Sequence, residues 1–477
     1  MGKITKNYIY NLIYQVFVMI VPLITAPYLA RVLGANCTGI FGYVHSMTAI
    51  VCTIVMLGVY NYGSRQIAYV RDNPKKRSEV FWQIMSLRLI IAIFGTIVFV
   101  GLIFIINKYI TFFLIYYTYL LVYFVDCTWL YVGVADMKWA VIKNAVTKAI
   151  SVAGIFTLVK SENDLYLYFL IQGCSVLISN LIAYSQLRLY IRRPHLDFSN
   201  VFDDLKGSVL LFLPSVAATI YTQSDKIMIE LMTGATNEVS FYDYSEKIVT
   251  IPLTFISVLS TVMMPRIANE YKKGNKDVIS DLINRAAKFS LFIAFPMCLG
   301  LISCADKLIP WYLGQSFLPT ITAIILISPI IVANTLTGIS GGQYFTATNQ
   351  MKILIISQFS AVVGNIAINA FLIPFFGFIG AAIATLATSY TCAIIQYFFL
   401  SKQVKLPGLI KSGLKYLTIS IAMFLVIRLI SADMSATPIT NIIQIVVGLC
   451  FYLGVCLIIK DEHIAMLSSK FIIHNKK

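Results

Sequence analysis

Long apolar runs of about 20 residues, separated by short polar connections, recur along the whole of this 477-residue chain. A helix rises about 1.5 Å per residue, so a run of this length spans the hydrocarbon core of a bilayer. Backbone polar groups in lipid must be paired within the protein, and a helix pairs them within one segment. The chain is therefore expected to be an all-α polytopic membrane protein.

Composition supports this class and excludes several functions. Hydrophobic residues make up 58% of the chain and charged residues 12%, whereas soluble domains have roughly 45–50% and 25%. The net charge of +16 comes from short basic runs between apolar segments, which is typical of cytoplasmic loops and not of a nucleic-acid surface. The sequence has no Walker loop, no nucleophile motif and no Cys/His cluster. It therefore predicts neither an enzyme nor an ATP-driven pump, and no metal site.

The apolar runs predict about 14 transmembrane helices. The predicted spans are 8–32, 40–62, 82–106, 111–133, 140–159, 165–187, 208–232, 241–264, 286–305, 320–341, 353–374, 379–400, 412–430 and 439–459. With this even count nearly all basic connections fall on one side of the membrane. They include the connection between the fourth and fifth spans, to which Lys138 and Lys143 are assigned. The opposite loops offer only Lys108, Lys160 and Lys307. Both termini are therefore expected to be cytoplasmic.

A weak internal repeat indicates two related halves. LGANCTGIFGY, around Gly34, aligns with TGATNEVSFYDY, around Gly234, at an offset of 200 residues, and a Met-Lys dipeptide opens or precedes both the fifth and the eleventh span. These matches predict six-helix lobes at 1–206 and 207–405, followed by two additional helices and a tail at 406–477. Parallel repeats of this kind place a substrate site between the halves, near the midplane.

Charged residues inside the predicted spans are the candidate functional residues. A charge at membrane depth costs at least roughly 2.5–3.5 kcal/mol, so it normally faces a protein interior or a water-filled cavity. Cations outnumber acids among them, which favours an anionic cargo such as a phosphate-bearing lipid. The candidate substrate ligands are Arg31, Arg88, Lys148, Asp225, Lys226 and Lys247, and the candidate coupling or charge-balancing residues are Asp126, Glu230 and Glu246.

Structural explanations compete with a substrate role for several of these charges. Lys226 and Glu230 are four residues apart and can pair on one helical face, and cations near helix ends can extend to the headgroups. Neither explanation fits Lys148, which lies near the middle of its span. Its expected partner is Asp126, Asp225 or an anionic substrate.

Several segments carry a family resemblance. Residues 7–43, NYIYNLIYQVFVMIVPLITAPYLARVLGANCTGIFGY, resemble the first two helices of bacterial polysaccharide repeat-unit flippases of the Wzx type, which share the MOP superfamily with lipid II flippases and multidrug extruders. Residues 224–230, 242–271 and 369–385 resemble further family segments. The chain departs from the family at one place. After Trp129 the family often has a glycine followed closely by a glutamate, but here Gly133 is followed by no nearby glutamate, and Asp136 is the candidate substitute.

The resemblance implies a flippase that moves undecaprenyl-diphosphate-linked oligosaccharides for capsule or O-antigen from the inner to the outer leaflet of the bacterial cytoplasmic membrane by alternating access. Arg31, Lys148 and Lys226 would contact diphosphate or acidic sugar, positioned by Asp225 and Glu246. It implies H⁺ or Na⁺ as coupling ion, no other cofactor, and membrane lipids and polysaccharide polymerase machinery as partners. A teichoic-acid precursor or lipid II flippase is the close alternative. A multidrug/cation antiporter is less expected, because these charges are not mainly acidic.

Overall fold

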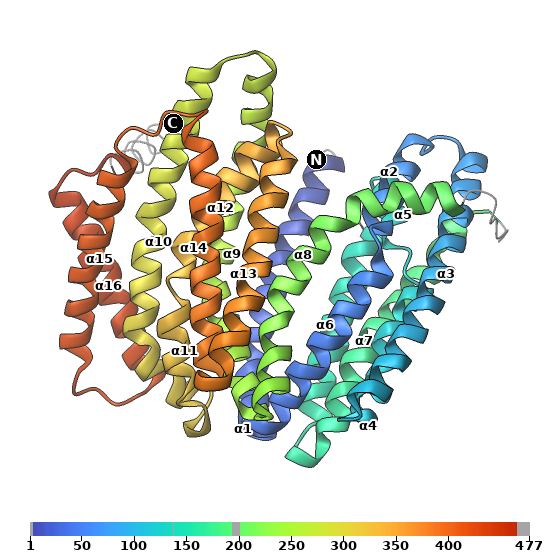
Figure 1. The fold of residues 1–477 in the computed structure, drawn as a ribbon, viewed down its shortest axis with the longest axis horizontal. Helices are drawn as coiled ribbons and strands as arrows, with labels where there is room; N and C mark the ends of the chain where they lie inside the picture. The colour runs from blue at the N-terminus through green and yellow to red at the C-terminus, as the bar shows by residue number, and fades with distance from the viewer. Residues whose placement is uncertain (1–2, 137, 193–200, 465–477) are drawn as a thin grey trace. The chain divides into compact units, whose positions relative to one another are not determined.

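The computed structural model describes residues 3–136, 138–192 and 201–464, and within these ranges every regular element is helical (Figure 1). This confirms the all-α class. The chain divides into two compact units, unit 1 (Met1–Glu230) and unit 2 (Leu231–Lys477). Helix α8 crosses the boundary between them. The lobe boundaries predicted at residues 206 and 405 stay a prediction.

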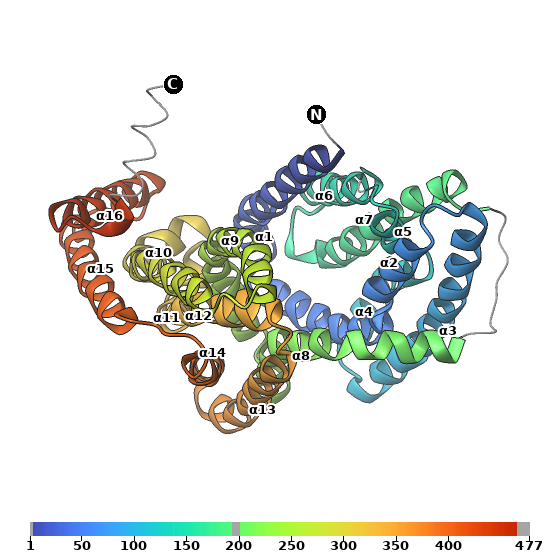
Figure 2. The ribbon, with the colours of Figure 1, turned by 90° about the horizontal axis from the view of Figure 1, so that it is seen from above.

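Unit 1 contains eight α-helices and three short 3₁₀ turns. In chain order they are α1 (Lys3–Met56), α2 (Val59–Tyr69), α3 (Pro74–Ile106), α4 (Ile110–Leu121), η1 (Val122–Phe124), α5 (Thr128–Gly133), α6 (Lys138–Leu158), η2 (Glu162–Asp164), α7 (Leu165–Ser185), η3 (Gln186–Leu189) and α8 (Val201–Thr233). Seen from above, α6 and α7 run side by side (Figure 2). The predicted fifth and sixth spans correspond to these two helices.

Unit 2 contains the remaining helices. In order they are α9 (Thr236–Lys272), α10 (Lys276–Tyr312), η4 (Gln315–Phe317), α11 (Thr320–Ile327), α12 (Ile330–Thr337), the π-helix η5 (Gly338–Phe345), α13 (Met351–Phe376), α14 (Phe378–Ser401), α15 (Leu409–Ser431) and α16 (Pro438–Ile458). Helices α13 and α14 form a close antiparallel pair (Figure 2). Helices α15 and α16 pack together and against α10 (Figure 1).

Among the described residues, 11 helical segments are long and apolar enough to cross a membrane, so the protein is a multi-pass membrane protein. The predicted count of 14 is not confirmed. One reason is that Val21–Tyr69 counts as one segment although non-helical residues interrupt it. Another is that α8 and α9, which carry several charges each, are not among the eleven.

Two glycines mark the junctions that the repeat analysis aligned. Gly34 interrupts α1 with φ 70° and ψ 177°, so the two predicted first spans form one helical element with a sharp break. Gly234 has φ 68° and lies between α8 and α9. Positive φ is costly for residues that carry a Cβ, so both positions favour glycine. The break at Gly34 also brings the chain beside Glu162, whose Oε1 lies 3.1 Å from where a Cβ would be.

Close helix packing in unit 1 depends on glycine. At Gly133, at the end of α5, an added Cβ would lie 2.6 Å from the Cβ of Ile67 and 2.8 Å from the carbonyl oxygen of Ser64, both on α2. At Gly63, on α2, it would lie 2.6 Å from the Trp129 ring. Trp129 is fully buried. The two glycines therefore permit the approach of α2 and α5.

Replacing Gly133 by alanine is expected to destabilise unit 1 by about 1–3 kcal/mol, because the methyl group meets backbone as well as side chain and the helices must separate. The measurement is thermal unfolding of the purified protein in detergent. Gly101→Ala on α3 is the matched control, since no atom lies within 4 Å of its added Cβ. An equal melting temperature for both variants would contradict this packing argument.

A carboxylate caps a helix in unit 2. Glu238, in the first turn of α9, accepts a hydrogen bond through Oε2 from the backbone N–H of Phe378 at 2.9 Å, at the start of α14. The preceding Gly377 has φ 54° and ψ −134°, and a Cβ there would lie 2.0 Å from the Glu238 carboxylate. The negative charge stabilises the positive end of the α14 dipole. The turn between α13 and α14 is thereby fixed to α9.

Polar contacts attach the two last helices to each other and α16 to α10. Asp461, just after α16, is ion-paired with Lys415 of α15 and accepts a hydrogen bond from the Tyr416 hydroxyl at 3.0 Å. The Tyr452 hydroxyl of α16 donates to the carbonyl of Phe292 on α10 at 2.7 Å. These bonds hold α15 and α16 in a defined position.

His463, beside this cluster, should make the stability of this region depend on pH. The ring is buried against Phe289 and Phe292. Burial lowers its pKa below 6.5, with Lys415 and Lys288 acting in the same direction and Asp461 and Glu462 opposing them. As the pH falls, the unfolded chain therefore gains a proton on this ring before the folded protein does. The free energy of unfolding should fall as the pH drops from 7 to 5.

Thermal unfolding followed from pH 7.5 to 5 measures this effect, and His463→Phe should flatten the response. If the unfolding temperature of His463→Phe depends on pH between 7.5 and 5 as that of the wild type does, the pH dependence does not come from His463.

The Asp461 carboxyl affects stability in a different pH range. Burial alone would raise its pKa, but hydrogen bonds from Lys415, the His463 N–H and Tyr416 outweigh burial and hold the pKa below 3.8. Its contribution is present above pH 3.8 and is lost only as the pH falls through the lower folded value.

Candidate functional site

Two cations of unit 1, Arg88 and Lys143, meet at Asp126, where the chain leaves helical structure between η1 and α5. Its Oδ1 accepts hydrogen bonds from the backbone N–H of Thr128 at 3.1 Å and from the Thr128 hydroxyl. Such a local bond to the backbone two residues onward is how aspartate stabilises turns. The carboxylate is thereby fixed at the start of α5.

Arg88, on α3, supplies the first counter-charge. One of its terminal nitrogens lies 2.9 Å from Oδ2 of Asp126, and the two side chains are only 3% and 15% exposed. The guanidinium also donates through Nε to the carbonyl of Tyr123 at 2.8 Å and lies 5.6 Å from the centre of the Tyr123 ring. Arg88 was predicted as a substrate ligand. That role stays a prediction, and in the structure its guanidinium is bonded to protein groups.

Lys143, on α6, supplies the second counter-charge. Its Nζ lies 2.6 Å from the Thr128 hydroxyl, 3.2 Å from Oδ1 of Asn180 on α7 and 3.5 Å from Oδ1 of Asp126. An ammonium group has three N–H donors, so these three acceptors occupy all of them. We call Arg88, Asp126, Thr128, Lys143 and Asn180 the Asp126 network. It carries two cations and one anion.

The sequence reasoning assigned Lys143 to a cytoplasmic loop, and this was wrong. The residue lies in the second turn of α6 and its side chain is 13% exposed. The predicted fifth span, beginning at residue 140, already contained it. Its position within an apolar segment, like that of Asp126, was the signal that could have identified the pair.

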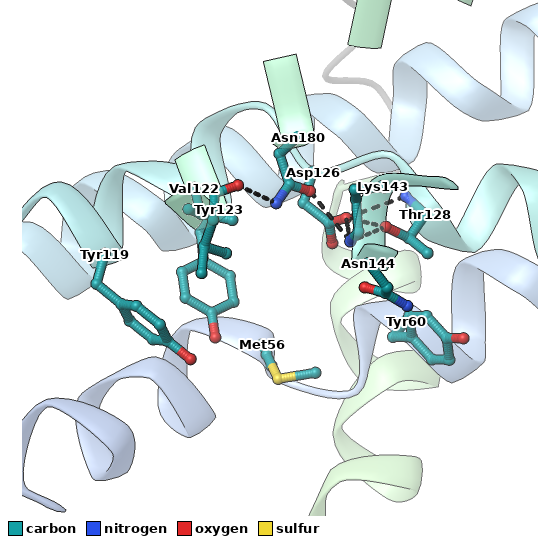
Figure 3. A pocket seen from close by; sticks show the side chains of 11 residues that line it. Met56, Tyr60, Tyr119, Val122, Tyr123, Asp126, Thr128, Lys143, Asn144 and Asn180 are labelled. Carbon is teal, nitrogen blue, oxygen red and sulfur yellow. Dashed lines mark hydrogen bonds and ion pairs between the residues drawn. The ribbon is translucent and has the colours of Figure 1, made fainter. Parts of the chain in front are cut away.

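A cavity of about 280 Å³ adjoins the Asp126 network within unit 1. Figure 3 shows the network members Asp126, Thr128, Lys143 and Asn180 along one side of it, with the amide of Asn144 beside the ring of Tyr60. The rings of Tyr119 and Tyr123 lie on the other side. The sequence reasoning did not find these tyrosines. The lining residues are Met56, Tyr60, Tyr119, Val122, Tyr123, Asp126, Thr128, Lys143, Asn144, Val176 and Asn180. The cavity is therefore lined by aromatic, amide and charged groups together.

Lys148 lies on α6 four residues after Asn144, so the two side chains share a helical face about 6 Å apart along the axis. It is partly buried. It forms no ion pair or hydrogen bond with any residue in the described part of the chain. The expected partnership with Asp126 was wrong, because that carboxylate bonds Arg88 and Lys143. An anionic substrate remains a candidate partner.

Helix α8 buries Asp225, Lys226 and Glu230, with exposures of 2%, 7% and 2%. Glu230 is held by Lys108, whose Nζ lies 2.5 Å from Oε1, and by the Tyr109 hydroxyl at 3.1 Å. The predicted pair of Glu230 with Lys226 is therefore replaced by a contact with the α3–α4 connection. The functional roles predicted for the three residues stay predictions.

The other predicted site residues lie on different helices. Arg31 is exposed on α1, before the break in that helix. In unit 2, Lys247 pairs with Asp243 one turn earlier on α9 at 2.5 Å, and Glu246 beside it is partly buried. Among the residues that the structure describes, no group of three or more metal-ligating side chains is present.

Asp136, the candidate substitute for a family glutamate, has a structural contact. It accepts a hydrogen bond from the Tyr190 hydroxyl at 2.7 Å. Burial, followed by this hydrogen bond, raises the pKa of Tyr190 to about 12. The contact joins the α5–α6 connection to the end of η3.

Sequence comparison identifies a family and relatives that this chain resembles. Residues 4–270 match the family model described as "Polysaccharide biosynthesis protein". The Escherichia coli (strain K12) protein named "Putative O-antigen transporter" is 23% identical over 408 residues, which cover 83% of this chain and 96% of that protein. The lipid II flippase MurJ of Bacillus subtilis (strain 168) is 24% identical over 163 residues, which cover 34% of this chain and 30% of MurJ.

Solved structures share the fold. Lipid II flippase MurJ in an inward closed conformation superimposes with a TM-score of 0.71 at 18% identity, covering 95% of this chain and 99% of that structure. An inward-facing multidrug resistance MATE transporter of the MOP superfamily has a TM-score of 0.64 at 13% identity, covering 84% and 99%. The chain shares the fold of these MOP superfamily structures. Because the family model matches more than half of its length, the chain belongs to the polysaccharide biosynthesis protein family.

Proposed function

We propose that the protein is a flippase for undecaprenyl-diphosphate-linked oligosaccharides, which it moves from the inner to the outer leaflet of the bacterial cytoplasmic membrane. The relative named as an O-antigen transporter and the MurJ relatives support a lipid-linked saccharide as the class of cargo. Both termini are cytoplasmic in this proposal, since most basic connections then face the cytoplasm. Alternating access is coupled to a proton or sodium gradient.

The observation that carries the proposal is Lys148, a cation within a membrane helix that has no protein partner in the described residues. An unpaired charge at that depth is costly and is typical of a substrate pathway. A diphosphate oxygen compensates an ammonium group by a charge-assisted hydrogen bond. The cavity one helical turn away offers polar and aromatic groups for the attached sugar.

The alternatives differ in what they require of this region. A multidrug/cation antiporter needs an acidic surplus, but the Asp126 network has one carboxylate for two cations. A lipid II or teichoic-acid precursor flippase shares the diphosphate and differs in the headgroup alone. These two remain within the proposed class.

Native mass spectrometry of the protein purified from its producing cells in mild detergent tests the proposal. We expect a bound polyprenyl-diphosphate glycan, whose mass gives the sugar composition. Lys148→Met should lose most of that adduct, whereas Lys160→Met, a cation beyond the end of the same helix, should keep it. Retention of bulk phospholipid alone by the wild type, or of a cationic drug, would contradict the proposal.

A further inference from the structure

The cavity of unit 1 has charges beside it that are already neutralised or bonded. Lys143 has an acceptor for each of its three donors, and Asp126 accepts from Arg88, Lys143 and Thr128. An anion entering the cavity would have to break these bonds, and separating a buried pair is strongly unfavourable. The cavity is therefore not built to take the diphosphate.

Polar groups without a hydrogen bond to the described residues also line the cavity. The Asn144 amide and the hydroxyls of Tyr60 and Tyr119 form no hydrogen bond with any described residue, and Figure 3 shows Asn144 and Tyr60 side by side. An amide offers two donors and an acceptor, and each hydroxyl offers one donor and two lone pairs. Such groups pair with neutral hydroxyl or acetamido substituents.

Two aromatic rings at the cavity are held in place by their neighbours. Tyr119 stacks on Tyr116, with ring centres 5.1 Å apart and planes 19° apart. Tyr123 is held by the Arg88 guanidinium, 5.6 Å from its ring centre. An aromatic face is negative and attracts the weakly positive C–H groups of a saturated ring. Rings fixed in advance lose little entropy when they bind.

The volume of the cavity suits a small ligand. At about 280 Å³ it lies near the lower end of the range for small-molecule pockets, roughly 300–1,000 Å³. It is large enough for one sugar residue. Asn144, which lines the cavity, lies one helical turn from Lys148. One molecule can therefore place a sugar beside Asn144 and its phosphate beside Lys148.

From these observations we infer that the unit 1 cavity is a subsite for one uncharged sugar residue of the cargo, held by Tyr60, Tyr119 and Asn144 and separate from the group that binds phosphate. The Asp126 network is its rigid wall. The inference rests on the proposed function for the identity of the cargo as a lipid-linked saccharide. It adds that selection of the cargo includes a neutral sugar read by unit 1.

The test compares soluble probes that share a farnesyl diphosphate group and differ in the sugar attached to it, or carry none. They are farnesyl diphosphate and its conjugates with glucose, N-acetylglucosamine and glucuronic acid, titrated into the full-length protein in nanodiscs. The neutral sugars should bind about tenfold more tightly than farnesyl diphosphate, which is about 1.4 kcal/mol, and glucuronic acid should give no gain. Tyr119→Leu and Asn144→Ala should each remove the gain and leave farnesyl diphosphate binding unchanged.

Tyr117→Leu is the matched control. Tyr117 lies on α4 like Tyr119, is partly buried and shares a hydrogen bond with Thr96, but it does not line the cavity. The variant should therefore keep the gain in affinity for the neutral sugars. Thermal unfolding verifies that each variant folds. Equal wild-type affinity for all four probes, or a gain that survives in both cavity variants, would overturn the subsite.

A lipid-free probe separates the subsite from the proposed function. Methyl N-acetyl-β-glucosaminide should show saturation-transfer NMR signals with the wild type and with Tyr117→Leu, and none with Asn144→Ala. If these signals appear while farnesyl diphosphate fails to bind, the flippase proposal fails and the sugar subsite stands. If farnesyl diphosphate binds and the glycoside gives no signal, the subsite fails alone.

Discussion

Asp126→Ala should destabilise unit 1 by about 3–5 kcal/mol, because it leaves the buried Arg88 without its carboxylate and removes an acceptor from Lys143. Arg88 is 2% exposed, so its guanidinium depends largely on protein groups for its partners. The expected result is a large fall in the unfolding temperature in detergent and loss of transport in cells. Thermal unfolding and the yield of monodisperse protein measure it.

The double variant Arg88→Met/Asp126→Leu provides the control. Replacing a buried ion pair by apolar residues of similar size is often neutral, so the double variant should recover much of the stability lost in Asp126→Ala. A double variant that adds the losses of its single variants would show that the two residues do not act as a pair. A single variant as stable as the wild type would contradict the burial argument itself.

Lys148→Met should have the opposite signature, loss of transport with equal or higher stability. The side chain has no protein partner among the described residues, so its charge contributes no attraction that offsets its cost in the membrane. Methionine keeps a similar unbranched length. Surface polysaccharide in cells reports transport, and thermal unfolding of the same protein reports stability.

The contrast with Lys143→Met makes this prediction specific. That variant removes a cation bonded to three acceptors and should lose stability together with transport. If Lys148→Met is strongly destabilised, the residue has a structural partner. If it is stable and fully active, Lys148 does not bind the cargo.

Sequence reasoning predicted the class of fold because length and apolarity of a helix in lipid are set by the bilayer and not by tertiary detail. It placed the ends of spans less well. Gly34 breaks α1 without a loop, and no apolarity pattern distinguishes such a break from a gap between two helices. The Glu238 carboxylate that caps α14 bonds across 140 residues of sequence, which a local pattern does not contain.

The candidate site shows the same limit. Asp126 and Arg88 could be singled out because each is charged within an apolar run. Their pairing with each other and with Lys143 depends on how α3, α5 and α6 pack. Lys143 was assigned to a loop because basic residues between apolar spans were taken as cytoplasmic. The cavity tyrosines carry no such signal, because aromatic residues are common throughout these helices.

Reconstitution measures the proposed transport most directly. The protein is placed in liposomes with a fluorescent short-chain polyprenyl-diphosphate oligosaccharide, and a membrane-impermeant quencher reports its movement between leaflets under an imposed proton or sodium gradient. We predict gradient-dependent flipping by the wild type and by Lys160→Met, and flipping at the level of empty liposomes by Lys148→Met. Folded, reconstituted wild-type protein that leaves the lipid-linked sugar in its original leaflet under both gradients would contradict the flippase assignment.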